Sequence, residues 1–105
     1  MTVPAIYPEL HAFLTGMNQN PPTPLSTTEI DRLIRRIPPT FSELTPTACA
    51  IAVEIHKQLH LLKTDVLFWQ AARQPATQTQ RYRQIQQRLG ILQGYVEQLL
   101  SLGDG

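Results

Sequence analysis

Two long stretches in the second half of the chain share one apolar spacing. In each, apolar residues recur at alternating steps of three and four, which is the spacing of a heptad seam along a helix. In residues 46–73 the seam consists of Ala48, Ala52, Ile55, Leu59, Leu62, Val66 and Trp69. In residues 77–102 it consists of Tyr82, Ile85, Leu89, Leu92, Val96 and Leu99. The pattern therefore predicts two long helices.

Only residues 74–76 separate these two helices, so we expect them to fold back on one another as an antiparallel hairpin. Thr45 and Pro46 are typical of a helix start, and Thr77 with Gln80 has the spacing of a capping box for the second helix. The seams match layer by layer, pairing Trp69 with Tyr82, Val66 with Ile85, Leu62 with Leu89, Leu59 with Leu92, Ile55 with Val96 and Ala52 with Leu99.

The first half of the chain predicts two shorter helices, over residues 7–17 and 26–37. The apolar stripe of the first consists of Ile6, Leu10, Phe13, Leu14 and Met17, and that of the second of Ile30, Leu33, Ile34 and Ile37. Prolines in residues 18–25 and Pro38-Pro39 separate the helices. A capping box from Ser26 to Glu29 opens the second helix, and we expect Phe41 and Leu44 of the following connector to enter the core.

The fold class expected is all-α: a single domain, residues 1–105, in which the two shorter helices pack along the long hairpin. Some apolar residues lie off the hairpin seam and need a second partner. These are Ile51, Val53, Leu61, Leu67, Phe68, Ile91, Tyr95, Leu100 and Leu102. Because two short helices cannot cover all of them, we predict a homodimer.

Composition limits the class of protein and the cellular compartment that we expect for this chain. Its 105 residues are 42% hydrophobic with a net charge of +1, which favours a folded protein over a disordered one. The lone Cys49 cannot form an internal disulfide, which fits a reducing cytoplasm. The longest apolar run, residues 48–53, is far below the roughly 20 residues of a membrane span. We therefore expect a cytoplasmic protein with neither an export signal nor membrane insertion.

No set of residues announces catalysis, so we expect a protein that is not an enzyme, with no catalytic residue, cofactor or metal. His56 and His60 share a helix face and offer two zinc ligands, but Lys57 stands where a zinc protease motif has glutamate. We interpret both histidines as structural and Cys49 as a small buried residue. The glycines are scattered, so none forms a phosphate-binding loop.

Charge is concentrated near the predicted turn. From Lys57 to Arg88 there are six basic residues and one acidic residue, Asp65. Arginines near a helix start oppose the helix dipole, which hints at a role beyond stability. The candidate partner-binding residues are Trp69, Gln70, Arg73, Gln74, Arg81 and Arg83. Three interpretations stay open: a protein-binding tip, a nucleic-acid-binding tip whose aromatic residues stack on bases, and a solvated basic turn.

The segment LLKTDVLFWQAARQPATQTQR, residues 61–81, resembles the C-terminal hairpin of the cyanobacterial heterocyst frequency control protein family, PatD. The resemblance rests on Asp65, Phe68, Gln70, Ala71, Ala72, Arg73, Gln74, Pro75, Ala76 and Thr77, and it extends over residues 57–100. It implies a small cytosolic regulator without enzymatic activity, linked to developmental patterning and to assembly of the tubulin-like division protein FtsZ. The partner implied is a protein, whereas a nucleic acid is the alternative.

Overall fold

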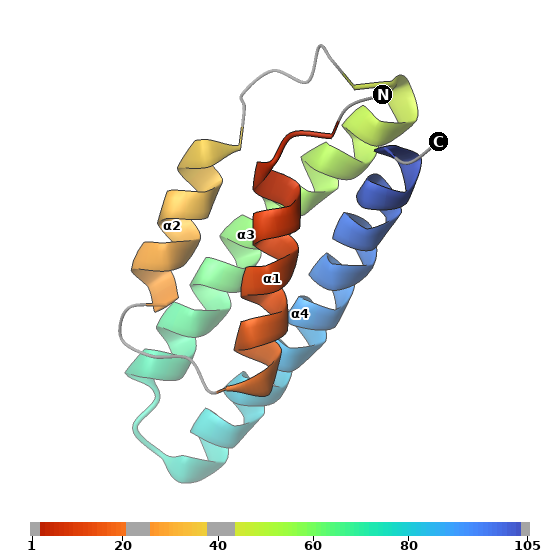
Figure 1. The fold of residues 1–105 in the computed structure, drawn as a ribbon. Helices are drawn as coiled ribbons and strands as arrows, with labels where there is room; N and C mark the ends of the chain where they lie inside the picture. The colour runs from red at the N-terminus through yellow and green to blue at the C-terminus, as the bar shows by residue number, and fades with distance from the viewer. Residues whose placement is uncertain (1–2, 21–25, 38–43, 104–105) are drawn as a thin grey trace.

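Four helices make up the described parts of the chain, residues 3–20, 26–37 and 44–103 of a computed structural model. They are α1 (Ile6–Gln19), α2 (Ser26–Arg36), α3 (Pro46–Ala71) and α4 (Pro75–Gly103). The described residues include no strand, so the predicted all-α class is confirmed. Successive helices run in opposite directions, and α3 and α4 form the long hairpin (Figure 1).

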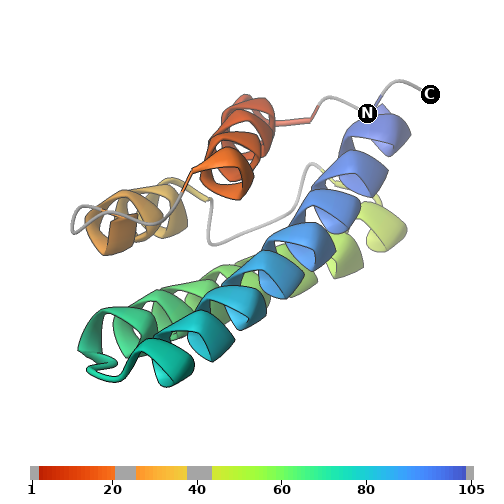
Figure 2. The same cartoon turned by 90° about the horizontal axis from the view of Figure 1, so that it is seen from below.

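The helices form two layers, with α1 and α2 lying on one side of the hairpin (Figure 2). α1 packs against α4 and α2 against α3, whereas α1 and α2 touch each other least. At about 1.5 Å per residue, α1 and α2 reach roughly 21 and 17 Å, against roughly 39 and 44 Å for α3 and α4. The two shorter helices therefore cover only part of the hairpin.

Both predicted seams form the core except at their last layer, Trp69 and Tyr82. The buried members of α3 and α4 are Ala48, Ala52, Ile55, Leu59, Leu62, Val66, Ile85, Leu89, Leu92, Val96 and Leu99. From the first half of the chain come Ile6, Tyr7, Leu10, Leu14, Met17, Ile30, Leu33 and Ile37. Phe13, Ile34, Leu44 and Trp69 are partly buried against this core. Trp69 and Tyr82, the last predicted layer, are half-buried.

A polar contact joins the two long helices beside the seam. Arg88 of α4 donates from Nε to Asp65 Oδ2 of α3 at 3.0 Å, and from its terminal nitrogen to Gln58 Oε1 at 2.8 Å. The predicted partners Leu62 and Leu89 lie within a turn of these residues. The contact therefore agrees with the expected antiparallel register.

Polar pairs also attach the shorter helices to the hairpin. His11 of α1 contacts Glu97 of α4 at 3.2 Å, and Lys63 of α3 pairs with Asp31 of α2 at 2.8 Å. The Lys63 ammonium, by hydrogen bond and by charge, holds the pKa of Asp31 below its usual value despite some desolvation. These contacts place α1 and α2 on different helices of the hairpin.

The predicted turn is displaced by two residues. α3 ends at Ala71 instead of residue 73, and α4 begins at Pro75 instead of residue 77, so residues 72–74 form the turn. The Gln78 N–H donates to the Gln74 carbonyl at 2.9 Å, which makes Gln74 the first backbone acceptor of α4. Proline fits this first helical position because its φ is fixed and its missing N–H has no partner to lose. The capping box at Thr77 and Gln80 is therefore wrong.

Of the remaining helix boundaries, the starts of α2 and α3 are as predicted, and the others differ by one or two residues. α1 extends over Ile6–Gln19 instead of residues 7–17, and the Asn20 side chain donates to the Gly16 carbonyl at its end. α2 begins at Ser26 itself and ends at Arg36, one residue before the expected end. Thr45 is confirmed as the cap of α3, because its hydroxyl accepts from the Ala48 N–H at 3.3 Å.

The burial of individual residues differs in part from the prediction. Tyr7 is fully buried, although the predicted stripe of α1 omitted it. Cys49 is half-buried instead of buried. Of the two connector residues, Leu44 packs partly against the core, and Phe41 lies outside the described residues.

Within the part of the chain that the structure describes, no helix is both long and apolar enough to cross a membrane.

Candidate interaction surface at the hairpin tip

The end of the hairpin, residues 67–84, is hereafter the tip. It comprises the last turn of α3, the connection and the first turns of α4, and the connection lies beyond the ends of α1 and α2 (Figure 1). No residue of the tip is buried. Leu67 and Phe68 are respectively 47% and 51% exposed, so two adjacent large apolar residues face solvent here.

The structure separates the three candidate arginines into two environments. Arg73, in the turn, and Arg83, on α4, are exposed, and neither forms an ion pair with any described residue. Arg81 is half-buried: its guanidinium lies over the Phe68 ring, 4.9 Å from the centroid, and donates to Gln84 at 3.2 Å. The cation–π contact therefore links α4 to α3. Arg73 and Arg83 are therefore the two arginines of the tip whose side chains are exposed to solvent.

A small hollow lies beside Trp69. It has a volume of about 240 Å³ and is lined by Trp69, Gln78, Thr79 and Tyr82; we name it the tip hollow. Gln78 precedes Tyr82 by four residues and Thr79 precedes it by three, so all three occupy one face of α4. The sequence analysis selected neither Gln78 nor Thr79, although their spacing from Tyr82 indicates this shared face.

The two candidate glutamines occupy different places. Gln70 is exposed on the last turn of α3, and Gln74 is exposed in the connection just before Pro75. The backbone carbonyl of Gln74 is used by Gln78, whereas its side chain faces solvent. Of the predicted set, Trp69 alone lines the tip hollow, with Arg73 four residues after it.

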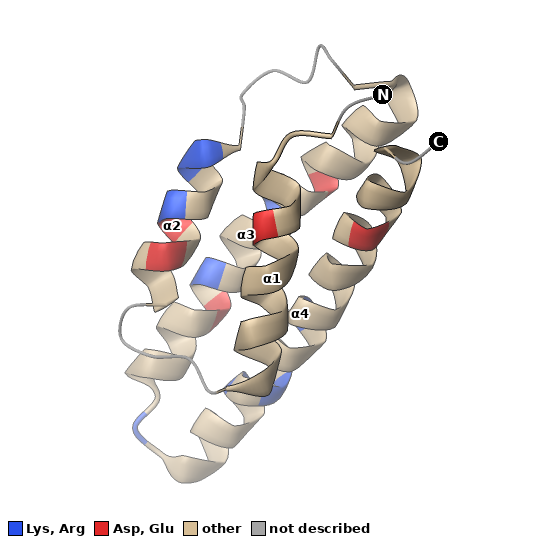
Figure 3. Ribbon diagram, viewed as in Figure 1, with Lys and Arg blue, Asp and Glu red and all other residues tan. Residues whose placement is uncertain are grey.

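The electrostatic character of the tip is uniformly basic. Residues 66–96 contain no aspartate or glutamate, while the tip contains Arg73, Arg81 and Arg83. Figure 3 shows no acidic ribbon in this part of the hairpin. The nearest acid in α3, Asp65, already contacts Arg88. No carboxylate within the hairpin is therefore available to neutralise the tip.

The two histidines of α3 lie in edge-to-face contact, with ring centroids 4.8 Å apart. Burial, and to a lesser extent the neighbouring His60, holds the pKa of His56 below its usual value. Two imidazoles alone make an incomplete metal site. In the described ranges, no group of three or more His, Cys, Asp or Glu side chains is arranged to hold a metal ion.

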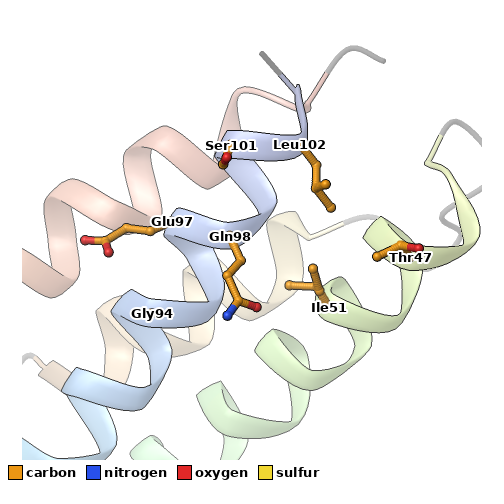
Figure 4. Close-up of a pocket in the computed structure, with 7 residues that line it drawn as sticks. All are labelled: Thr47, Ile51, Gly94, Glu97, Gln98, Ser101 and Leu102. Carbon is orange, nitrogen blue, oxygen red and sulfur yellow. The ribbon is translucent and has the colours of Figure 1, made fainter. Parts of the chain in front are cut away.

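A larger hollow, of about 660 Å³, lies at the opposite end of the hairpin from the tip. Figure 4 shows Ile51 of α3 and Leu102 of α4 pointing toward one another, with Gln98 beside them. Its one ionisable lining residue, Glu97, points away from this gap and contacts His11 of α1. The lining therefore offers apolar contact and amide hydrogen bonds, without a pair of groups suited to acid–base chemistry.

Comparison with known proteins found no relative of this chain. No family model, no curated protein and no solved structure matches the chain.

Proposed function

We propose that this chain is a cytosolic regulator without enzymatic activity that acts by binding another protein through the tip. The observation that supports this proposal is the bare end of the hairpin, where large apolar residues stay exposed beside unpaired arginines. Aromatic residues and arginine are enriched among the residues that dominate protein interfaces. The polar groups of the tip also suit recognition more than proton transfer, because arginine stays protonated at neutral pH.

FtsZ is the first partner to test, because the likeness of residues 61–81 to the PatD family implies a link to FtsZ assembly. Purified chain should alter the sedimentation of assembling FtsZ. An affinity pull-down from a cyanobacterial lysate, read by mass spectrometry, tests for other proteins. Recovery of a different protein through the tip would replace FtsZ as the partner while keeping the proposed mode of action.

The tip itself is tested by reversing its exposed charges. Arg73→Glu with Arg83→Glu should keep the helicity and melting temperature of the wild type and lose the recovered partner. Arg81 is less suitable for this test, because replacing it also breaks its contacts with Phe68 and Gln84. The matched control is Arg32→Glu with Arg35→Glu, two exposed arginines of α2 that give the same change of net charge.

Unchanged partner binding by the tip variant would contradict the assignment of the tip. Loss of binding by the α2 variant to the same extent would show that net charge, and not position, decides recognition. If the tip variant binds its partner unchanged, the uncovered faces of the hairpin become the better candidate surface.

A nucleic-acid-binding module is the second candidate function. The aromatic side chains beside arginines favour it, since bases stack on such residues in single-stranded complexes. Affinity for an oligonucleotide should fall steeply with salt, because each neutralised phosphate releases counterions. An interface anchored by Trp69 should change less with salt. A log–log slope close to zero would exclude the nucleic-acid candidate.

We also propose that the chain forms a homodimer through the uncovered side of the hairpin. Leu61 lies one turn before Asp65, and Ile91 lies one turn after Arg88, so the contact between Asp65 and Arg88 brings the two exposed apolar residues near each other. Sedimentation equilibrium should find a dimer of the 11.9 kDa chain. Leu61→Glu with Ile91→Glu should dissociate it. A wild-type chain that stays monomeric at high concentration would contradict the homodimer.

A further inference from the structure

We propose that the tip binds an acidic segment of its partner, with one apolar side chain seated in the tip hollow and flanking carboxylates on Arg73 and Arg83. This inference rests on the proposed protein-binding function and adds the chemistry of the partner. It follows from the size of the hollow, from the polarity of its lining and from the pattern of charge around it.

The size of the tip hollow fits a single side chain. Its volume of about 240 Å³ is below the roughly 300 to 1,000 Å³ of ordinary small-molecule pockets. Trp69 and Tyr82 supply large apolar faces, and both remain only half-buried in this chain. An aliphatic or aromatic side chain placed between them would remove further apolar surface from water. The hollow therefore suits an anchor residue of a peptide segment.

The rest of the lining suits a peptide backbone. Gln78 and Thr79 provide an amide and a hydroxyl, each able to donate and to accept a hydrogen bond. Both side chains are exposed, and neither forms a hydrogen bond with a described residue, so their polar groups face solvent. Thr79 also precedes Arg83 by four residues, which places Arg83 on the adjoining turn of the same helix face. One edge of the hollow thus offers neutral hydrogen-bonding groups next to a positive charge.

The charge pattern indicates carboxylates as the complement. Elsewhere in the hairpin the basic residues have acidic neighbours: Lys57 pairs with Glu54, Lys63 with Asp31, and Arg88 with Asp65. At the tip, the exposed arginines face no acid of the hairpin. Arginine holds a carboxylate through two parallel hydrogen bonds, which gives both affinity and orientation. The tip is therefore complementary to a segment rich in aspartate or glutamate.

The extent of this charge favours an acidic protein segment over a nucleic acid. A single-strand-binding groove follows the phosphate backbone for several nucleotides with continuous positive charge. Here the unpaired charge stops within the tip, because the next basic residue along α4, Arg88, is engaged by Asp65. A patch of this length matches a few carboxylates around one anchor residue.

The test uses the full chain and the fluorescence of Trp69, its single tryptophan. The probe is a synthetic peptide with one leucine between two short runs of glutamate. Three matched probes accompany it: the same peptide with serine for leucine, a peptide with lysine for every glutamate, and a single-stranded oligothymidine of equal charge. We expect the acidic leucine peptide to shift the Trp69 emission saturably at low salt and to bind at least about tenfold more tightly than either altered peptide.

The charge-reversal variants locate the binding. Arg73→Glu with Arg83→Glu should weaken the acidic leucine peptide at least about tenfold, and Arg32→Glu with Arg35→Glu should change it far less. Thr79→Trp, which fills the hollow with a large side chain, should abolish the advantage of leucine over serine. Because this variant adds a second tryptophan, its binding is measured with a fluorescently labelled peptide.

The outcomes that overturn the inference differ from those that overturn the proposed function. Equal binding of the lysine peptide, no binding of any peptide by the wild type, or tighter binding of oligothymidine would show that the chemistry assigned to the partner is wrong. In each case the pull-down with the tip variant separately decides whether the tip binds a protein. If that variant also retains its cellular partner, the proposed function fails as well.

Discussion

The hairpin has two regions, which we call the covered half, residues 46–66 and 85–103, and the tip. Both follow the same apolar spacing, but they differ in burial. Where α1 and α2 lie on the hairpin, every seam residue from Ala48 to Val66 and from Ile85 to Leu99 is buried. In the tip the spacing continues through Trp69 and Tyr82, yet neither is buried. A pair of helices can exclude water only along their common line, so complete burial needs further helices above that line. The covered half therefore supplies stability, and the tip keeps apolar and charged groups available.

The largest expected effect contrasts a leucine in each half. Leu62→Ala removes a fully buried side chain of the covered half and should lower the free energy of unfolding by about 2 to 5 kcal/mol. Leu67→Ala, in the tip, should lower it by about 1 kcal/mol or less because Leu67 is already half exposed. Urea denaturation of both variants measures the difference. Equal losses would show that the tip is packed as tightly as the covered half.

The next effect concerns the boundary between the halves. The side chains of Arg88 and Asp65 are 26% and 13% exposed, so Arg88→Ala leaves a mostly desolvated carboxylate without its partner. The expected loss of unfolding free energy is about 1 to 3 kcal/mol. The control Arg83→Ala, in the tip, should stay within about 0.5 kcal/mol of the wild type. Thermal melts that move equally for the two variants would contradict a structural role for the boundary contact.

A smaller effect, of opposite sign, is expected in α1, one of the two helices that cover the hairpin. The hydroxyl of Tyr7 is buried and has no hydrogen-bond partner among the described residues, and burial, with a contribution from the nearby Cys49, raises the pKa of Tyr7 above its usual value. Tyr7→Phe removes the unsatisfied group and keeps the ring. Stability should stay unchanged or increase by up to about 1 kcal/mol. A clear loss of stability in urea denaturation would show that the hydroxyl has a hydrogen-bond partner in solution.

The smallest effect is a pH dependence confined to the covered half. Because the folded chain lowers the pKa of His56, the unfolded chain binds this proton first as the pH falls. The contribution of His56 to stability is therefore complete above the unfolded pKa of about 6.5 and decreases as the pH falls below it. His56→Gln should flatten the stability profile there, and His60→Gln should flatten it less. An unchanged slope in His56→Gln would contradict this assignment.

The core of the hairpin was predictable because both seams repeat over many turns and each repetition supports the others. Single signals were less reliable. Tyr7 has the same alternating spacing with Leu10 and Leu14 as the seams of the hairpin, so its burial was available from the pattern. The turn was misplaced because the capping-box spacing of Thr77 and Gln80 favours a helix start at residue 77, although Pro75 suits a first helical position as Pro46 does.

The position of the candidate site in the chain was predictable, but the arrangement of its side chains was not. The concentration of arginine and aromatic residues drew attention to residues 69–83, which the structure places at the end of the hairpin. Composition could not show that Arg81 lies over Phe68 while Arg83 stays exposed, because that division depends on how α3 and α4 face each other. Gln78 and Thr79 were missed because exposed polar residues of a helix give no signal until a neighbour such as Trp69 forms a hollow with them.

The attachment of α1 to α4 has a consequence for the order of folding. Residues His11 and Glu97, which join these helices, are 86 positions apart, whereas Arg88 and Asp65 of the hairpin are 23 apart. Closing the longer loop costs about 1 kcal/mol more chain entropy. Local pairings form earliest in folding, so φ-values should be higher in the hairpin than in α1. The tip would then take shape before α1 docks, and a nascent chain would present it as soon as α4 is complete.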